Sequence, residues 1–182
     1  INAVKKTIMS KSIDLIVMGT NGVTGAKENI FGSNTINVLR KVNCQTLVIP
    51  ENYKFNPLKE VLLPLDLHDS MSGIPFDKLL IFIKKFMCKM HILRINPQND
   101  NTELSNIDHT QILKFSKGIN YKYHIINNIP MHYVIGCYTQ VFNIDLTIIL
   151  VQHENFFKRF FKKSSNTQIS NSIRTPLLII HS

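Results

Sequence analysis

The sequence predicts an α/β fold of the doubly wound kind, with a five-stranded parallel sheet and a partial second copy of the same layout. Short apolar runs rich in Ile, Val and Leu alternate with segments of helical periodicity, as in parallel sheets whose strands are buried on both faces. One stretch of the chain repeats once without a gap, and one apolar run leads into a glycine-rich loop before a helix.

The repeat places Asp14–Pro50 over Asp145–His181. Each copy begins with an acidic residue and an apolar run, passes through a polar Ser/Asn/Thr cluster, and ends in a second apolar run. In the first copy Ile36, Leu39 and Val42 form a helical stripe. Each copy is therefore interpreted as strand, loop, helix and strand, which is a βαβ crossover.

Residues 57–182 are predicted to form a complete unit of five strands. The strands are expected within Lys59–Leu67, where the strand ends at Asp66, and at Lys89–Ile95, Tyr121–Asn127, Leu146–Val151 and Leu177–Ile180. Helices are expected over Phe76–Phe86, which has apolar residues at i, i+3, i+4 and i+7, over His109–Lys117, and from Pro130 to Phe142. The polar stretch Asn96–Asp108 is expected to be a loop.

Residues 1–52 are predicted to be the C-terminal part of another such unit, with a helix at Asn2–Lys11 and strands at Leu15–Met18 and Thr46–Ile49. Counterparts of three strands and two helices of the second unit do not precede it. The chain also begins with Ile1 rather than Met, so the expectation is a tandem protein truncated at its N-terminus.

Composition excludes several classes of protein. With 44% apolar and 18% charged residues the chain is globular, and no apolar run approaches the length of a membrane span. The separated Cys44, Cys88 and Cys137 suit a reducing cytoplasm, and scattered histidines predict no metal site. The net charge of +9 fits either an anionic partner or a lysine-rich surface, and without a nucleic-acid-binding motif we expect no nucleic acid.

The glycine loop has two interpretations. Gly19, Gly22 and the Gly32-Ser33 pair lie between a strand and a helix, where free backbone N–H groups can bind a phosphate and Ser33 can act as the N-cap. Alternatively the glycines serve turns and close packing. The loop lacks both the Gly-Lys-Ser/Thr of a P-loop and the G-x-G-x-x-G of a dinucleotide fold, so spacing alone leaves both interpretations open.

The stretch "DLIVMGTNGVTG…FGSNT…VLRKVNCQTLVIP" resembles the universal stress protein family, whose nucleotide-binding members carry G-x2-G-x9-G-[S/T]. The pattern is intact at Gly19, Gly22, Gly32 and Ser33. "KEVLLPLDL" is similar to the first strand of the family, with Pro64 and Asp66 at matching positions, and "IRTPLLIIHS" is similar to its last strand. Gln45 stands where that family usually has proline.

The resemblance implies an ATP-binding stress-response regulator of the cytoplasm. The glycine motif has no Walker lysine, arginine finger or base to activate water, so we expect no enzyme activity beyond weak ATP hydrolysis by the intact protein. ATP, with or without Mg²⁺, would lie against the glycines and the helix start, with Met18 near the base and ribose. The implied binding residues are Met18, Gly19, Gly22, Gly32, Ser33, Asn34 and Thr35, and more weakly Pro64, Asp66 and Ser164. The resemblance also implies pairing through the last strands, between the two units at Thr46–Ile49 and Leu177–Ile180 or between two copies as a homodimer.

The second unit departs from this pattern, because Leu150, His153 and Lys163 stand where the first has Gly19, Gly22 and Gly32. The intervening Phe156, Phe157, Phe160 and Phe161 could plug a vacant pocket, form an interface or stack on a ligand, and the basic residues beside them could attract an anion or be solvated. The alternative function is therefore a pairing or scaffold module without a ligand. A third hypothesis is an adenylating enzyme. Against it, the sequence has no second acidic or basic cluster after a strand end.

Overall fold

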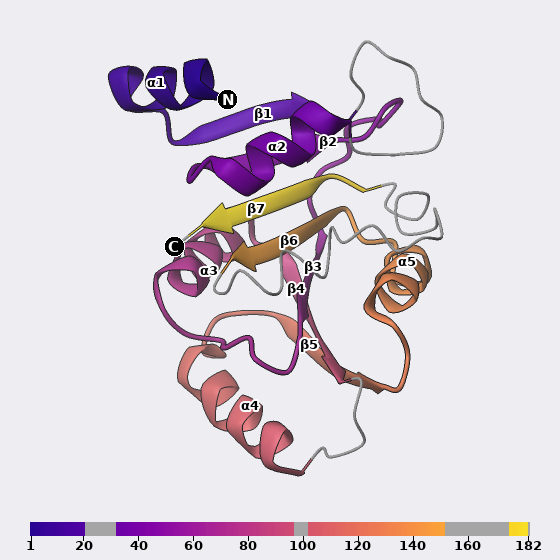
Figure 1. Ribbon diagram of the computed structural model, residues 1–182. Helices are drawn as coiled ribbons and strands as arrows, with labels where there is room; N and C mark the ends of the chain where they lie inside the picture. Colours follow the sequence, from indigo (N-terminus) through magenta and orange to yellow (C-terminus); the bar gives the residue numbers. More distant parts are fainter. Residues whose placement is uncertain (21–31, 97–101, 152–174, 182) are drawn as a thin grey trace.

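The structure, a computed structural model, describes residues 1–20, 32–96, 102–151 and 175–181 (Figure 1). The strands are β1 (Leu15–Gly19), β2 (Gln45–Ile49), β3 (Glu60–Leu65), β4 (Lys89–Asn96), β5 (Tyr121–Asn127), β6 (Leu146–Val151) and β7 (Leu177–His181). The helices are α1 (Asn2–Lys11), α2 (Ser33–Lys41), α3 (Ile74–Phe86), α4 (Thr102–Phe115) and α5 (Met131–Val141). The expected α/β class is confirmed.

All the described strands form one sheet of seven strands in the order β1-β2-β7-β6-β3-β4-β5. The predicted five-stranded parallel sheet is the part β7-β6-β3-β4-β5, so the count of five falls short of the whole sheet. β2 pairs antiparallel with β7, and this pairing joins the parallel pair β1–β2 to the five-stranded part. Both joining strands are rich in Leu, Val and Ile, and pairing them removes two apolar edges from water.

The strand register supports the gapless repeat. In the first copy Ile16 pairs with Thr46, and the corresponding residues of the second copy, Thr147 and Leu177, pair in the same way. The antiparallel join is symmetric about the equivalent residues Leu47 and Leu178, since Thr46 faces Ile179 and Val48 faces Leu177. The two copies are therefore related by a pseudo-twofold axis through the join, as in an isologous dimer.

Helices cover both faces of the sheet. On one face α3 and α4 pack over β3, β4 and β6, with Phe76, Leu79 and Ile112 in the core. On the other face α2 and α5 contribute Leu39, Val134 and Ile135. Burying each such side chain stabilises the fold by about 1.5–3 kcal/mol. The strands carry apolar residues on both faces, as a buried parallel sheet requires.

Helix α4 begins earlier than the sequence indicates. The stretch Asn96–Asp108 was expected to be a loop with a helix only from His109, but the helix starts at Thr102. Asn and Asp lower intrinsic helix propensity, yet a tertiary contact can outweigh it. Here the buried carboxylate of Asp108 pairs with Arg94 on β4, which fixes this turn of the helix against the sheet.

Candidate functional site

The end of β1 and the start of α2 lie close together. The Thr35 hydroxyl donates to the carbonyl oxygen of Gly19 at 3.0 Å, and the Gly32 N–H donates to the carbonyl oxygen of Thr20 at 2.6 Å. The Thr20 N–H in turn donates to Ile49 on β2, which fixes this turn to the sheet. Two of the predicted glycines therefore lie at the same end of the helix, even though the loop between them, residues 21–31, lies outside the described residues.

The predicted N-cap changes by one residue. Gly32 is the N-cap of α2 and Ser33 is its first helical residue, and within the described part of the chain no side-chain cap is found at this helix start. Asn34 is exposed at the helix start, whereas the half-buried Met18 packs into the core below it. Gly22, Ser164 and the Phe156–Phe161 segment lie outside the described residues.

Gly19 and Gly32 have backbone conformations open to other residues. A Cβ added at Gly19 would meet no atom within 4 Å, and Gly32 has φ −58° and ψ 155°. In the second copy the counterpart of Gly19 is Leu150, which is buried in the core. The same strand position is thus open space in one half and filled core in the other.

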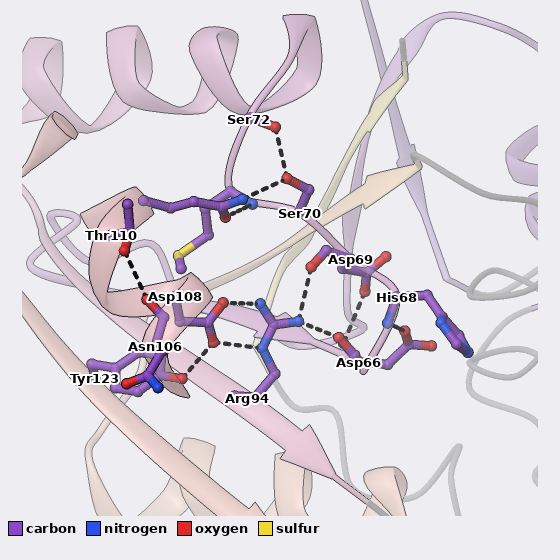
Figure 2. Close-up of polar contacts among 12 residues, drawn as sticks. Asp66, His68, Asp69, Ser70, Ser72, Arg94, Asn106, Asp108, Thr110 and Tyr123 are labelled. Carbon is purple, nitrogen blue, oxygen red and sulfur yellow. Dashed lines mark hydrogen bonds and ion pairs between the residues drawn. The ribbon is translucent and has the colours of Figure 1, made fainter. Parts of the chain in front are cut away.

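The end of β3 forms a closed polar turn (Figure 2). The Asp66 N–H donates to Asp69 Oδ2 at 2.9 Å, and Asp66 Oδ1 accepts the N–H of His68 at 2.8 Å. Asp66 is only 3% exposed, so its carboxylate organises the turn rather than standing open to solvent. Pro64 lies within β3 beside Leu93 of β4.

Arg94 fixes this turn from β4. Its guanidinium donates to the carbonyl oxygens of Asp66 and Asp69, and forms a bidentate pair with Asp108 at 2.8 Å (Nε to Oδ2) and 2.5 Å (Nη2 to Oδ1). The Tyr123 hydroxyl also donates to Asp108, and burial together with this carboxylate raises the pKa of Tyr123. The bidentate geometry satisfies a buried cation and a buried anion together.

A second polar chain lies under α5. Glu60 Oε2 is 2.5 Å from His91 Nε2, His91 Nδ1 is 2.9 Å from the Tyr138 hydroxyl, and that hydroxyl is 2.8 Å from His124 Nδ1. Burial lowers the pKa of His91, against the opposing effect of Glu60, so the ring is neutral near pH 7. Burial and Glu60 raise the pKa of Tyr138 to about 12.

The sequence analysis predicted neither the Arg94–Asp108 network nor the polar chain from Glu60 to His124. One signal was available, because Arg94 interrupts the apolar run "KMHILRI" at a position that a buried strand reserves for core residues. A charged residue there requires a buried partner, although the sequence does not identify Asp108 as that partner. Across the described residues no three metal-ligating side chains gather, and no helix there is both long and apolar enough to cross a membrane.

Comparison with known families identifies the part of the chain that carries the glycines. Residues 2–50, which hold β1, α2 and β2, match the model described as the universal stress protein family. A comparison with curated proteins finds no match.

Solved structures extend the likeness to the fold of nearly the whole chain. A universal stress protein from Archaeoglobus fulgidus is 18% identical with a TM-score of 0.68, covering 98% of this chain and 66% of its own length. A putative universal stress protein from Pseudomonas aeruginosa is 12% identical with a TM-score of 0.66 and the same coverage, 98% and 66%. The chain thus spans just under two thirds of the length of both structures.

The fold is also found in a different setting. The cytoplasmic domain of a prokaryotic cation chloride cotransporter has a TM-score of 0.52 at 9% identity, over 91% of this chain and 62% of that one. The function of this chain therefore has to be argued from its own residues.

Proposed function

We propose that the chain is a nucleotide-binding regulator of the universal stress protein type, which binds ATP at the glycine loop between β1 and α2. The carrying observation is that Gly19 and Gly32 meet at the uncapped start of α2 although neither has a conformation that needs glycine. A small residue there leaves the backbone N–H groups of the first turn accessible, and a helix N-terminus favours an anion. The phosphates of ATP suit such a site, with or without Mg²⁺.

We also propose the division into a partial unit, residues 1–52, and a complete unit, residues 57–182. The carboxylate of Asp145 accepts the N–H groups of Lys59 and Glu60, at 2.8 and 2.9 Å, and so fixes the start of β3 beside β6. Its counterpart Asp14 is exposed and accepts no hydrogen bond from the described residues. An additional parallel strand beside β1 would give Asp14 the role of Asp145.

The proposed activity is binding and regulation in the cytoplasm rather than catalysis. The segment "GAKENIFGSNT" has no Walker lysine placed before a Ser or Thr, and the sequence shows no arginine finger or base placed to activate water. Membranes and nucleic acids are not among the proposed partners.

Isothermal titration with ATP tests the proposal on the protein and on the variant Gly32→Lys. The positive charge of the lysine would by itself strengthen ATP binding. A loss of affinity would therefore show that ATP needs the space that glycine leaves free at position 32. The matched control is Ile81→Lys, on the solvent side of α3, where the side chain is 66% exposed. Equal affinity for Gly32→Lys and the unmodified protein would falsify the role of Gly32.

The second candidate function is a pairing or scaffold module without a ligand. Two observations favour it, namely the symmetric join of β2 to β7 and the buried Leu150 at the place of Gly19. Thermal melts in millimolar ATP discriminate between the two functions, because a ligand that binds only the folded state raises the melting temperature. A melting temperature insensitive to ATP would favour the scaffold.

A further inference from the structure

An apolar groove runs between β5 and α5 at the edge of the sheet opposite β1. Its volume is about 650 Å³, and its lining includes Tyr133, Val141 and Phe142. Sites for small molecules typically span about 300–1,000 Å³ and are lined mainly by apolar side chains with a few placed polar groups. The groove therefore has the size and lining of a small-molecule site.

The groove is exposed along α5, beside the edge strand β5. Tyr133, Cys137 and Val141 follow one another at i, i+4 and i+8 along α5, so they form one stripe of the helix. Tyr133 is 50% exposed and Val141 is 71% exposed, although both line the groove. β5 is the edge strand, so within the described sheet no further strand lies beside it to cover this stripe. Contiguous exposed apolar surface of this kind marks a binding surface.

One end of the groove is polar and carries positive charge. Lys122 Nζ lies 5.2 Å from the centre of the Phe142 ring, and the centre of the His124 ring lies 5.6 Å from the same point. Lys122 and His124 are two residues apart on β5, so they project from the same face of the sheet. None of the groove-lining residues is acidic. This end can therefore stabilise a negative charge next to an apolar surface.

The polar chain under α5 determines which ring nitrogen of His124 can contact a ligand. With His91 neutral, its Nε2–H donates to the Glu60 carboxylate, and Nδ1 accepts the proton of the Tyr138 hydroxyl. The Tyr138 oxygen must then accept the Nδ1–H of His124. This leaves His124 Nε2, which has no partner among the described residues, able to share a proton with a carboxyl group.

We propose that this groove binds a small amphipathic carboxylic acid. Its apolar body lies against Tyr133, Val141 and Phe142, and its carboxylate lies between the ammonium group of Lys122 and the imidazole of His124. The complementarity between this cationic end and an anionic head group selects an acid over a neutral apolar molecule. The site is distinct from the ATP site proposed at α2, because the two lie at opposite edges of the sheet.

Titration with 4-phenylbutyrate and with the neutral analogue 4-phenylbutanol tests the proposal. The acid can form charge-assisted hydrogen bonds that the alcohol cannot, so we expect the acid to bind at least about tenfold more tightly than the alcohol. Absence of acid binding, or equal affinity for acid and alcohol, would overturn the proposal. A groove occupied instead by a second copy would show concentration-dependent dimerisation without acid binding, which overturns it as well.

Two variants locate the binding to the groove. Lys122→Gln should weaken the acid about tenfold and leave the alcohol unchanged, since only the charge is lost. Val141→Glu places a carboxylate in the groove and should abolish acid binding. The matched control Ile81→Glu substitutes a similarly exposed apolar residue, 66% exposed, on α3 and should bind the acid normally. Circular dichroism melts confirm that each variant is folded, and unchanged acid binding in both groove variants would place the acid elsewhere and overturn the proposal.

Discussion

The first strand, β1, and its counterpart β6 have the same place in the repeat but different surroundings. Leu15 is 45% exposed and Leu146 is 3% exposed, while Val17 is 61% exposed and Ile148 is 0% exposed. β6 is paired on both sides, by β3 and β7, whereas β1 is paired only by β2 and lies at the edge of the described sheet. Leu146 and Ile148 also pack in the core that α3 covers, whereas no core cluster of the described residues includes Leu15 or Val17, so the burial of equivalent strand residues depends on what covers them.

The second difference concerns what each half packs at the carboxyl end of its strand. Leu150 fills core space on the α3 side of the sheet, and Gly19 leaves the corresponding space open. Below α4 the half that contains β6 also holds the buried pair of Arg94 and Asp108. One half is therefore closed by packing and polar contacts, and the other is open at the place where we propose that ATP binds.

The largest expected effect comes from breaking the polar network around Arg94. Arg94→Leu leaves the Asp108 carboxylate buried without its cation and should lower the free energy of unfolding by about 3–5 kcal/mol. Urea denaturation measures this loss in the free energy of unfolding, and Lys41→Ala on the exposed side of α2 is the surface control. The double variant Arg94→Leu/Asp108→Leu should recover part of the loss, and a double variant no more stable than the single one would contradict the uncompensated charge as the cause.

A matched pair of substitutions measures the difference between the two strands directly. Leu146→Ala removes a buried side chain and should cost about 2–5 kcal/mol of unfolding free energy. Leu15→Ala, at the equivalent position of β1, should change it by no more than about 0.5 kcal/mol, because the side chain is largely exposed. Denaturant titration of both variants gives the comparison, and similar losses would show that β1 is covered in solution.

The smallest expected effect concerns the glycines. Gly19→Ala should leave stability unchanged or raise it by about 0.4–1 kcal/mol, because the Cβ meets no atom and the unfolded chain loses freedom. Gly118→Ala should destabilise the protein, since Gly118 has φ +79°, a conformation that alanine adopts only under strain. Melting temperatures of the two variants measure the contrast. Marked destabilisation by Gly19→Ala would mean that the fold itself requires this glycine.

Local sequence patterns predicted most elements, and tertiary contacts explain the rest. The extents of α1 and β5 agree with the expected Asn2–Lys11 and Tyr121–Asn127, and in β5 the Tyr and Ile residues have high β propensity. The start of α4 was wrong because the Arg94–Asp108 pair depends on residues that are far apart until the sheet forms. The groove under α5 was missed for a related reason, since it results from the position of β5 at the sheet edge.

Of the candidate site, the sequence predicted that the strand end at Gly19 and the helix start at Gly32 lie close together, because a βαβ crossover requires it. It could not predict the closed turn around Asp66. The role of a carboxylate at a strand end depends on which groups reach it, and here the N–H of His68 and the guanidinium of Arg94 organise that turn.

The symmetric join of β2 and β7 has a consequence for how this protein can change. In a dimer of identical copies each substitution is made twice, once in either copy, so a change that damages one site damages both. Here the related surfaces belong to one chain. The position equivalent to Gly19 is occupied by Leu150, while Gly19 itself is still a glycine. The join keeps the geometry of a pair while a substitution in one half leaves the other half unchanged.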